Sequence, residues 1–191
     1  MPPHGVRWMT NESVDRIDPS KFPGLSKHPG AELVAKNEEE TRKLGAALAR
    51  VARAGDFIAL VGDLGAGKTT LMQGLVEEID EHDQWQATSP TYALIQVYET
   101  APPIHHMDLY RLEGFEDLES IGYWDYADSR AGIICVEWLD RIPSAWPGRG
   151  LIVEFLRSKS GRIIRLWGDE AWKQRVEDVA GQLGHRVDRQ E

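Results

Sequence analysis

Apolar residues follow two kinds of pattern along this chain. Residues 56–61 and 131–137 are largely apolar, which is typical of strands buried on both faces of a parallel sheet. Other stretches space their apolar residues three or four apart, as amphipathic helices do, and Asn37 is a good N-cap for the first of them. The pattern predicts strands at 32–36, 56–61, 92–98, 104–110, 131–137, 151–156 and 162–167, and helices at 37–55, 68–79, 114–121 and 170–183.

The order of these elements indicates the fold class. Strands alternate with helices at first, and the last two strands flank residues 158–161 as an antiparallel hairpin. This order predicts an α/β fold whose mainly parallel sheet is flanked by helices and carries antiparallel additions. The 191 residues suffice for one well-buried core, and we expect that domain at 31–183. Residues 1–30 read as an N-terminal extension, flexible or draped over the body, and 184–191 as a C-terminal tail.

Charge is unevenly distributed along the chain. The formal net charge is -9 and the sequence pI is about 5.2, which argues against a protein that grips nucleic acid over its whole surface. Residues 141–191 hold ten Lys and Arg against seven Asp and Glu, so the first 140 residues hold the remaining twelve against twenty-four. Any polyanion should therefore meet the C-terminal third.

The chain has one cysteine and lacks a hydrophobic targeting segment. Cys135 cannot form an internal disulfide and lies in the apolar run I-I-C-V, where a small hydrophobic residue fits. Neither a signal peptide nor an apolar stretch of membrane-spanning length is visible. We therefore expect a cytoplasmic protein with no membrane partner.

The strongest local signal is a glycine-rich turn between a predicted strand and a predicted helix. Residues 62–69, G-D-L-G-A-G-K-T, match the phosphate-binding P-loop pattern G-x-x-x-x-G-K-[ST] at every fixed position. Glycines let the amide groups turn inward around phosphate oxygens, the lysine reaches the β- and γ-phosphates, and the threonine hydroxyl can ligate Mg²⁺. We expect nucleotide contacts from Asp63, Leu64, Gly65, Ala66, Gly67, Lys68, Thr69 and Thr70.

The alternative to a nucleotide site is a chance glycine turn between a strand and a helix. The flanks favour function, because a buried strand precedes the loop and an amphipathic helix follows it. A P-loop also needs carboxylates for its metal, and Asp108 and Glu137 each close an apolar strand. Taken singly, each acid is as readily explained as a strand end that faces solvent.

Two further polar segments, His105-His106 and Ser89-Pro90-Thr91, are candidates for the same site. His105 and His106 precede Asp108, and without a cysteine or further histidine nearby they are interpreted as partly buried strand residues rather than as zinc ligands. The segment Ser89-Pro90-Thr91 follows the P-loop helix, where nucleotide hydrolases often place a switch hydroxyl. Without that context it is a turn that opens a strand.

Five motifs occur in one order along the chain: G-D-L-G-A-G-K-T-T, S-P-T-Y, H-M-D-L-Y-R-L, E-D-L-E-S-I-G and V-E-W. In this succession residues 31–183 resemble the bacterial TsaE family, also called YjeE. The resemblance implies a small P-loop NTPase that hydrolyses ATP and is needed to make N6-threonylcarbamoyladenosine (t6A) in tRNA. It also implies the transferase TsaD and its partner TsaB as binding partners.

The same resemblance implies roles for individual residues. The loop residues would wrap the phosphates, and Thr69 and Glu137 would hold Mg²⁺. Asp108 would assist hydrolysis or the water shell of the metal, and Thr91 would be the switch hydroxyl. The start of the first helix, at Thr41, would lie near the adenine.

Two other functions compete with an ATPase that drives a tRNA-modifying complex. The first is a small-molecule kinase, against which we note that no arginine or lysine lies between Lys68 and Arg111 to form a lid over a transferred phosphate. The second is a nucleotide switch that binds ATP without hydrolysing it.

Overall fold

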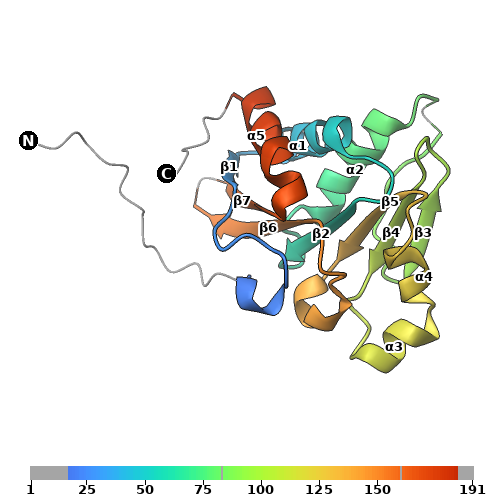
Figure 1. Ribbon diagram of the computed structural model, residues 1–191. Coiled ribbons are helices and arrows are strands. Elements are labelled where there is room, and N and C mark those ends of the chain that lie inside the picture. Colours follow the sequence, from blue (N-terminus) through green and yellow to red (C-terminus); the bar gives the residue numbers. More distant parts are fainter. Residues whose placement is uncertain (1–16, 83, 160, 185–191) are drawn as a thin grey trace, which may run out of the picture.

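The computed structural model describes residues 17–82, 84–159 and 161–184 (Figure 1). Its strands form one seven-stranded sheet in the order β1-β7-β6-β2-β5-β4-β3. They are β1 (Ala31–Ala35), β2 (Phe57–Gly62), β3 (Ile95–Tyr98), β4 (Ile104–Asp108), β5 (Ile133–Glu137), β6 (Leu151–Ser158) and β7 (Gly161–Gly168). The central strands β6, β2, β5 and β4 are parallel, and the outer strands pair antiparallel. The predicted fold class is confirmed.

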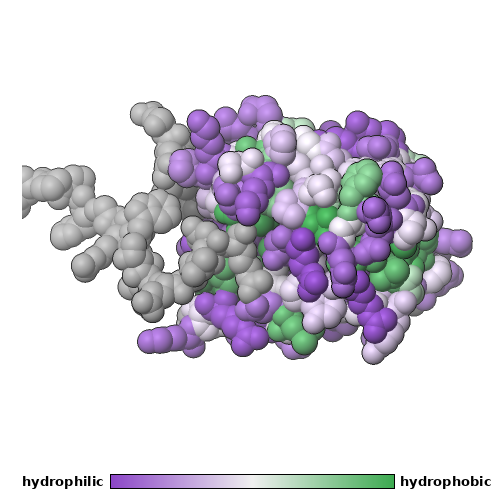
Figure 2. Space-filling view, turned by 90° about the horizontal axis from the view of Figure 1, so that it is seen from below, coloured by the Kyte–Doolittle hydropathy of each residue, from purple (hydrophilic) through white to green (hydrophobic). Residues whose placement is uncertain are grey.

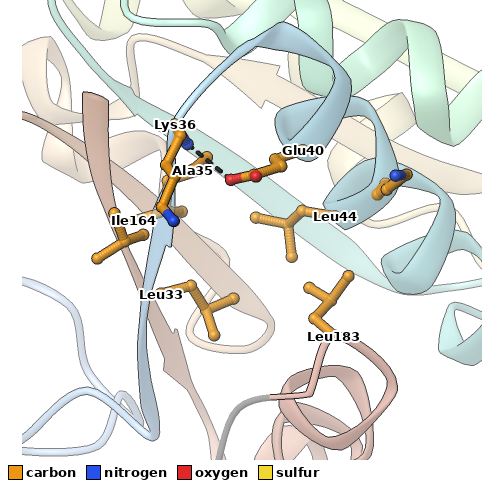
Figure 3. Close-up of a pocket in the computed structure, with 9 residues that line it drawn as sticks. Leu33, Ala35, Lys36, Glu40, Leu44, Ile164 and Leu183 are labelled. Carbon is orange, nitrogen blue, oxygen red and sulfur yellow. Dashed lines mark hydrogen bonds between the residues drawn. The ribbon is translucent and has the colours of Figure 1, made fainter. Parts of the chain in front are cut away.

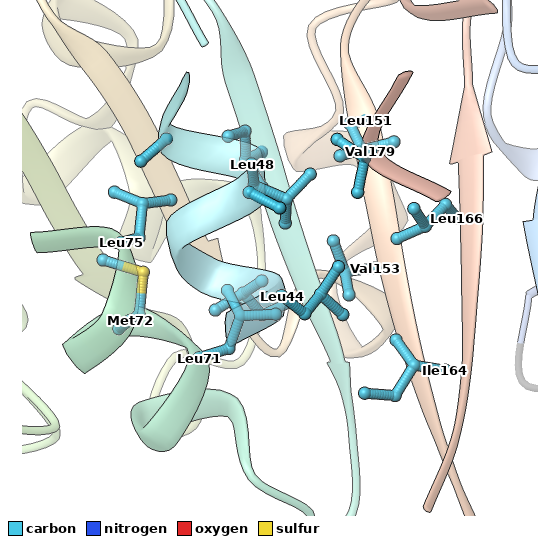
Figure 4. Close-up of a cluster of buried hydrophobic side chains, with 14 of the residues drawn as sticks. Leu44, Leu48, Leu71, Met72, Leu75, Leu151, Val153, Ile164, Leu166 and Val179 are labelled. Carbon is cyan, nitrogen blue, oxygen red and sulfur yellow. The ribbon is translucent and has the colours of Figure 1, made fainter. Parts of the chain in front are cut away.

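Helices cover both faces of the sheet (Figure 1). One face is covered by α1 (Glu38–Val51), α2 (Lys68–Ile79) and α5 (Lys173–Gln182), and Figure 4 shows the buried side chains between these helices and the strands. The other face packs against α3 (Phe115–Ser120), α4 (Tyr123–Ala127) and the 3-10 turns η2 (Leu139–Arg141) and η3 (Pro143–Ala145). Two further turns are η1 (Pro19–Lys21) and η4 (Glu170–Trp172).

The helices α1 and α2 pack backbone to backbone. A Cβ atom at Gly45 would lie 2.1 Å from the carbonyl oxygen of Leu71, and one at Gly74 would lie 2.1 Å from that of Arg42. Only glycine allows so close an approach. Because α2 carries the glycine-rich loop at its N-terminus, this packing brings the start of α1 beside that loop. The N-cap predicted for α1 is confirmed, since Asn37 Oδ1 accepts the Glu40 amide at 2.9 Å.

Residues 17–30 lie against the sheet. The Ile17 amide donates to Glu154 Oε1 at 3.2 Å, and Trp146 Nε1 donates to the Pro23 carbonyl at 2.9 Å. Phe22 is buried, with its ring edge-on to Trp146. This part of the predicted extension is therefore draped over the body. Residues 1–16 and most of the predicted tail, 185–191, lie outside the described residues, and the domain boundaries stay predictions.

Several elements differ in length from the sequence pattern. The strand expected from residue 92 begins at Ile95, because Leu94 adopts a φ of 64° and its amide closes a turn onto Pro90. The strand expected to reach residue 110 ends at Asp108, where the next amide donates to the carbonyl of Glu137. The short helix α4 was missed, since five residues are too few to display a helical period. Asp169 caps η4, which splits the last predicted helix into η4 and α5.

The surface is mostly polar with scattered hydrophobic residues. In the view of Figure 2, hydrophilic side chains lie between smaller hydrophobic patches. No helix within the described ranges combines the length and the apolar character needed to cross a bilayer. Two large side chains are notably exposed, Leu64 at 76% and Tyr92 at 85%. Both belong to segments that the sequence assigns to nucleotide binding.

Candidate functional site

The glycine-rich loop joins the central strand β2 to α2. Gly62, Gly65 and Gly67 have φ angles of 156°, 73° and 112°, in the region that side chains rarely adopt. A Cβ atom at Gly62 would also lie 2.8 Å from the Cβ of Phe155. The helix α2 begins at Lys68 without a side-chain cap, so its first amides face the loop as an anion-binding end.

Lys68 is buried beneath this loop. Its Nζ donates to the carbonyl oxygens of Gly62 at 2.9 Å and Asp63 at 3.0 Å. The same ammonium lies 3.8 Å from the ring centroid of Trp138, which follows β5 directly. The lysine thus joins the loop to the end of the neighbouring strand. Thr69 and Thr70 follow in the first turn of α2 and are half-buried.

The two predicted carboxylates lie side by side at the carboxyl-terminal ends of neighbouring strands. Asp108 and Glu137 are register partners on the parallel strands β4 and β5. Their exposed fractions are only 1% and 2%, so the interpretation of solvent-facing strand ends is wrong for both. Each therefore depends on hydrogen-bond partners within the fold.

Asp108 takes its partners from a loop. Its Oδ2 accepts the hydroxyls of Thr91 at 2.6 Å and Ser89 at 3.1 Å, and its Oδ1 accepts the amide of Tyr110 at 2.8 Å. The segment that the sequence interpreted as a switch or a simple turn is therefore attached to the strand-end acid. The ring of Tyr92, next along the chain, stacks under the guanidinium of Arg111.

Glu137 takes its partner from the neighbouring strand. Its Oε1 lies 3.0 Å from His106 Nε2, and the other ring nitrogen of His106 lies 3.4 Å from the Tyr98 hydroxyl. His105 lies on the opposite face of the sheet beside Tyr126, where burial lowers its pKa. Within the described ranges, no cluster of three His, Cys, Asp or Glu side chains is arranged to hold a metal ion.

The start of α1 and the β6–β7 hairpin complete the surroundings of the loop. A Cβ atom at Gly67 would lie 3.5 Å from Thr41 Cγ2 and 3.1 Å from Arg162 Nε. Arg157 Nη2 donates to the Leu64 carbonyl at 3.3 Å, and its Nε lies 3.7 Å from Asp63 Oδ2. Thr41 was predicted near the nucleotide, whereas the two arginines were missed. Their signal was the basic C-terminal third, which the hairpin brings to the loop.

A pocket of about 310 Å³ lies between the edge strand β1 and α1, away from the glycine-rich loop (Figure 3). Leu33, Leu44, Ile164 and Leu183 line it with apolar surface. At its rim the Lys36 amide donates to Glu40 Oε2 at 2.7 Å, the dashed line of Figure 3. This bond holds the turn into α1, which places Thr41 beside the loop.

Comparison with known proteins identifies the family of this chain. The family model described as "Threonylcarbamoyl adenosine biosynthesis protein TsaE" matches residues 35–164. The chain belongs to the TsaE family. The tRNA threonylcarbamoyladenosine biosynthesis protein TsaE of Streptomyces coelicolor is 38% identical over 150 residues, which cover 76% of this chain and 92% of that protein. The corresponding Nostoc protein is 43% identical over 110 residues, 56% of this chain and 67% of that one.

A solved structure supports the fold. The crystal structure of YdiB from Bacillus subtilis superposes with a TM-score of 0.61 at 28% identity, covering 81% of this chain and 93% of that one. The α/β fold is that of a P-loop NTPase. Membership of the TsaE family connects the chain with t6A biosynthesis in tRNA.

Proposed function

We propose that this protein binds ATP with Mg²⁺ and hydrolyses it to support t6A modification of tRNA, acting with the TsaD–TsaB transferase complex. The observation that carries the proposal is the pair of buried carboxylates in register beside the glycine-rich loop. Asp108 and Glu137 lie at the strand edge where α2 begins, next to a lysine that already faces carbonyl oxygens. A role on tRNA agrees with the cytoplasmic location expected from the sequence.

Binding begins at the loop. The amides at Gly65–Thr70 would surround the phosphates, and Lys68 would exchange the carbonyls of Gly62 and Asp63 for phosphate oxygens. The polar but uncharged Thr41 borders the loop from α1, and the cations Arg157 and Arg162 border it from the β6–β7 hairpin. This is where the remainder of the nucleotide would extend.

The oxygen donors beside the loop fit Mg²⁺. Hard oxygen ligands would come from Thr69, Glu137 and Asp108. Three protein ligands do not fill the coordination shell of Mg²⁺, which leaves positions for the phosphates of the substrate. When bound, the ion neutralises charge on the phosphate oxygens.

Hydrolysis requires an oriented water molecule. The water oxygen bonds to the γ-phosphorus while the bond to the β–γ bridging oxygen breaks, which yields ADP and phosphate. The buried carboxylates of Asp108 and Glu137 would orient this water and accept its proton. The hydroxyls of Ser89 and Thr91 hold Asp108, so a movement of their loop would alter its position.

The features around the site favour a partner-dependent activity. Leu64 and Tyr92 expose large apolar surface next to the loop and the strand-end acids. Large exposed apolar side chains beside a site mark protein contact surfaces. We therefore expect the TsaD–TsaB complex to cover this edge and to accelerate hydrolysis.

The runner-up is a small-molecule kinase. The stretch between Lys68 and Arg111 has no cation, but Arg157 and Arg162 reach the loop from the hairpin, so the loop does not lack arginines. The third candidate, a nucleotide switch, would need the loop alone and leaves the buried carboxylate pair without a task.

One assay separates the three functions. The purified protein is incubated with ATP and Mg²⁺, alone and then with TsaD, TsaB and unmodified tRNA, and phosphate release is followed. A sharp rise in hydrolysis with the partners supports the proposal. Phosphate transferred to a metabolite would favour the kinase, and tight ATP binding without turnover would favour the switch.

A further inference from the structure

A buried chain of three polar side chains ends on Glu137. The Tyr98 hydroxyl lies 3.4 Å from His106 Nδ1, and His106 Nε2 lies 3.0 Å from Glu137 Oε1. The exposed fraction of both Tyr98 and His106 is 0%. The rings of these two residues are stacked at an interplanar angle of 28°. The three groups therefore form one connected network closed to solvent.

The direction of each hydrogen bond follows from the chemistry of its members. A carboxylate that binds a metal ion only accepts hydrogen bonds, so with Glu137 in that role the proton between it and His106 would belong to Nε2. The other nitrogen, Nδ1, then accepts from the Tyr98 hydroxyl. Burial raises the pKa of the Tyr98 hydroxyl, which keeps it protonated and able to donate.

We infer that His106, held by Tyr98, is a positioning residue that fixes the Glu137 carboxylate for binding Mg²⁺ and for hydrolysis. This inference rests on the proposed function and adds a residue to it. Because the imidazole holds Oε1, the second oxygen of Glu137 would be the one to bind the metal ion at the end of β5. Partners that orient a metal-binding carboxylate commonly alter affinity or activity by about 10- to 100-fold when they are removed.

Packing alone does not explain a histidine here. Strand β4 places Ile104 on the same face two residues earlier, and Cys135 is the register partner of His106. A buried imidazole in this apolar layer costs desolvation free energy that an aliphatic side chain would avoid. Its two hydrogen bonds offset that cost and aim the acid.

The test compares three variants with the wild type. His106→Leu removes both hydrogen bonds, His106→Gln keeps a donor near the Nε2 position, and Tyr98→Phe removes only the remote hydroxyl. His105→Gln is the matched control, because it lies next along the same strand but faces the other side of the sheet. Thermal melting checks that each variant folds.

Calorimetry of ADP binding with and without Mg²⁺ gives a readout that needs no turnover. We expect His106→Leu to reduce the gain in ADP affinity that Mg²⁺ provides by about 10-fold or more, and to leave metal-free ADP binding unchanged. In the hydrolysis assay kcat should fall by about 10- to 100-fold with KM for ATP within about threefold. His106→Gln should recover most of both losses, and Tyr98→Phe should lie between.

A second readout uses the protein without nucleotide. In nitrogen-15 NMR of histidine-labelled protein, the signals lost in His106→Gln should be those of a ring that carries a proton on Nε2 and none on Nδ1. Glu137→Gln should shift those signals. A ring protonated at Nδ1 would overturn the inference, even if His106→Leu does not fold.

The failures are distinguishable. If the wild type neither binds ADP nor hydrolyses ATP, the proposed function is wrong. If the wild type is active and His106→Leu matches the His105→Gln control in Mg²⁺ dependence and kcat, the positioning role is wrong and the network is structural only. A loss in His106→Leu that His106→Gln fails to recover also contradicts the donor role.

Discussion

Two neighbouring strands end in a carboxylate at the same level, yet the two acids are held in different ways. Asp108 at the end of β4 binds hydroxyls of the loop at 89–91, whereas Glu137 at the end of β5 binds a histidine inside the sheet. Ser89 and Thr91 belong to no regular element, while His106 lies within a strand. The first acid is therefore bonded to a loop without regular secondary structure, and the second is bonded to a strand within the sheet.

We infer from this difference that the two chemically similar residues have distinct tasks. A carboxylate fixed to the sheet keeps one geometry and suits a metal ion, which demands fixed ligand positions. A carboxylate attached to a surface loop changes with that loop and suits coupling of hydrolysis to a partner. Substitutions of the two acids and of their partners test this difference directly.

Replacing Lys68 tests nucleotide binding, on which the roles of both acids depend. We expect Lys68→Ala to weaken ADP binding by about 100-fold or more, because the buried ammonium is the charge nearest the loop. Calorimetry measures the affinity. Lys173→Ala, which alters an exposed lysine on α5, is the control and should bind normally. Unaltered binding by Lys68→Ala would contradict the phosphate site.

Replacing Glu137 tests the fixed acid. Glu137→Ala should spare most metal-free nucleotide binding and reduce hydrolysis by about 100-fold or more, the usual cost of removing one group that acts on the transition state. Phosphate release at saturating ATP measures it. Glu116→Ala changes an exposed acid on α3 and serves as the control. Equal hydrolysis in Glu137→Ala and the wild type would refute its assignment as a metal ligand.

Removing the loop hydroxyls tests the coupled acid. The double variant Ser89→Ala, Thr91→Val leaves Asp108 without two of its three hydrogen bonds. We expect basal hydrolysis to fall by about 10-fold and partner stimulation to fall further, because the loop is no longer hydrogen-bonded to Asp108 through these hydroxyls. The ratio of rates with and without TsaD, TsaB and tRNA is the measurement. An unchanged ratio would show that the loop plays no part in coupling.

The smallest effect concerns His105 on β4. Burial lowers the pKa of His105 in the folded protein, so the unfolded chain binds its proton more readily. The stability from a neutral His105 is present above the usual pKa of about 6.5 and is lost as the pH falls below it. Chemical denaturation at a series of pH values should show a shallower decline for His105→Gln. A steeper decline would contradict this sign.

The sequence predicted the glycine-rich loop but not the arginines that lie beside it. Glycines at fixed spacing, a lysine and a threonine identify a P-loop because the contacts of that motif are local. Arg157 and Arg162 carry no such signal, since a hairpin nearly a hundred residues later brings them to Leu64 and Gly67. The interval without cations after Lys68 was therefore a poor argument about the charge around the loop.

Regular elements followed the same division. Strand and helix interiors were predicted from apolar spacing, whereas the ends at Leu94 and Asp108 depended on turns and neighbouring strands. The short α4 left no periodic pattern to detect. Ends are decided by long-range hydrogen bonds, which a local pattern does not contain.

The sequence pattern alone identified a P-loop motif between a buried strand and a helix, and two later strands that end in acids. The folded structure was needed to show that these acids are buried neighbours. It also showed that Asp108 is hydrogen-bonded to a loop and Glu137 to His106, and that the hairpin arginines border the site. The loop motif is formed by consecutive residues, so a short stretch of sequence is enough to identify it. Strand register instead depends on burying both faces of the whole sheet at once.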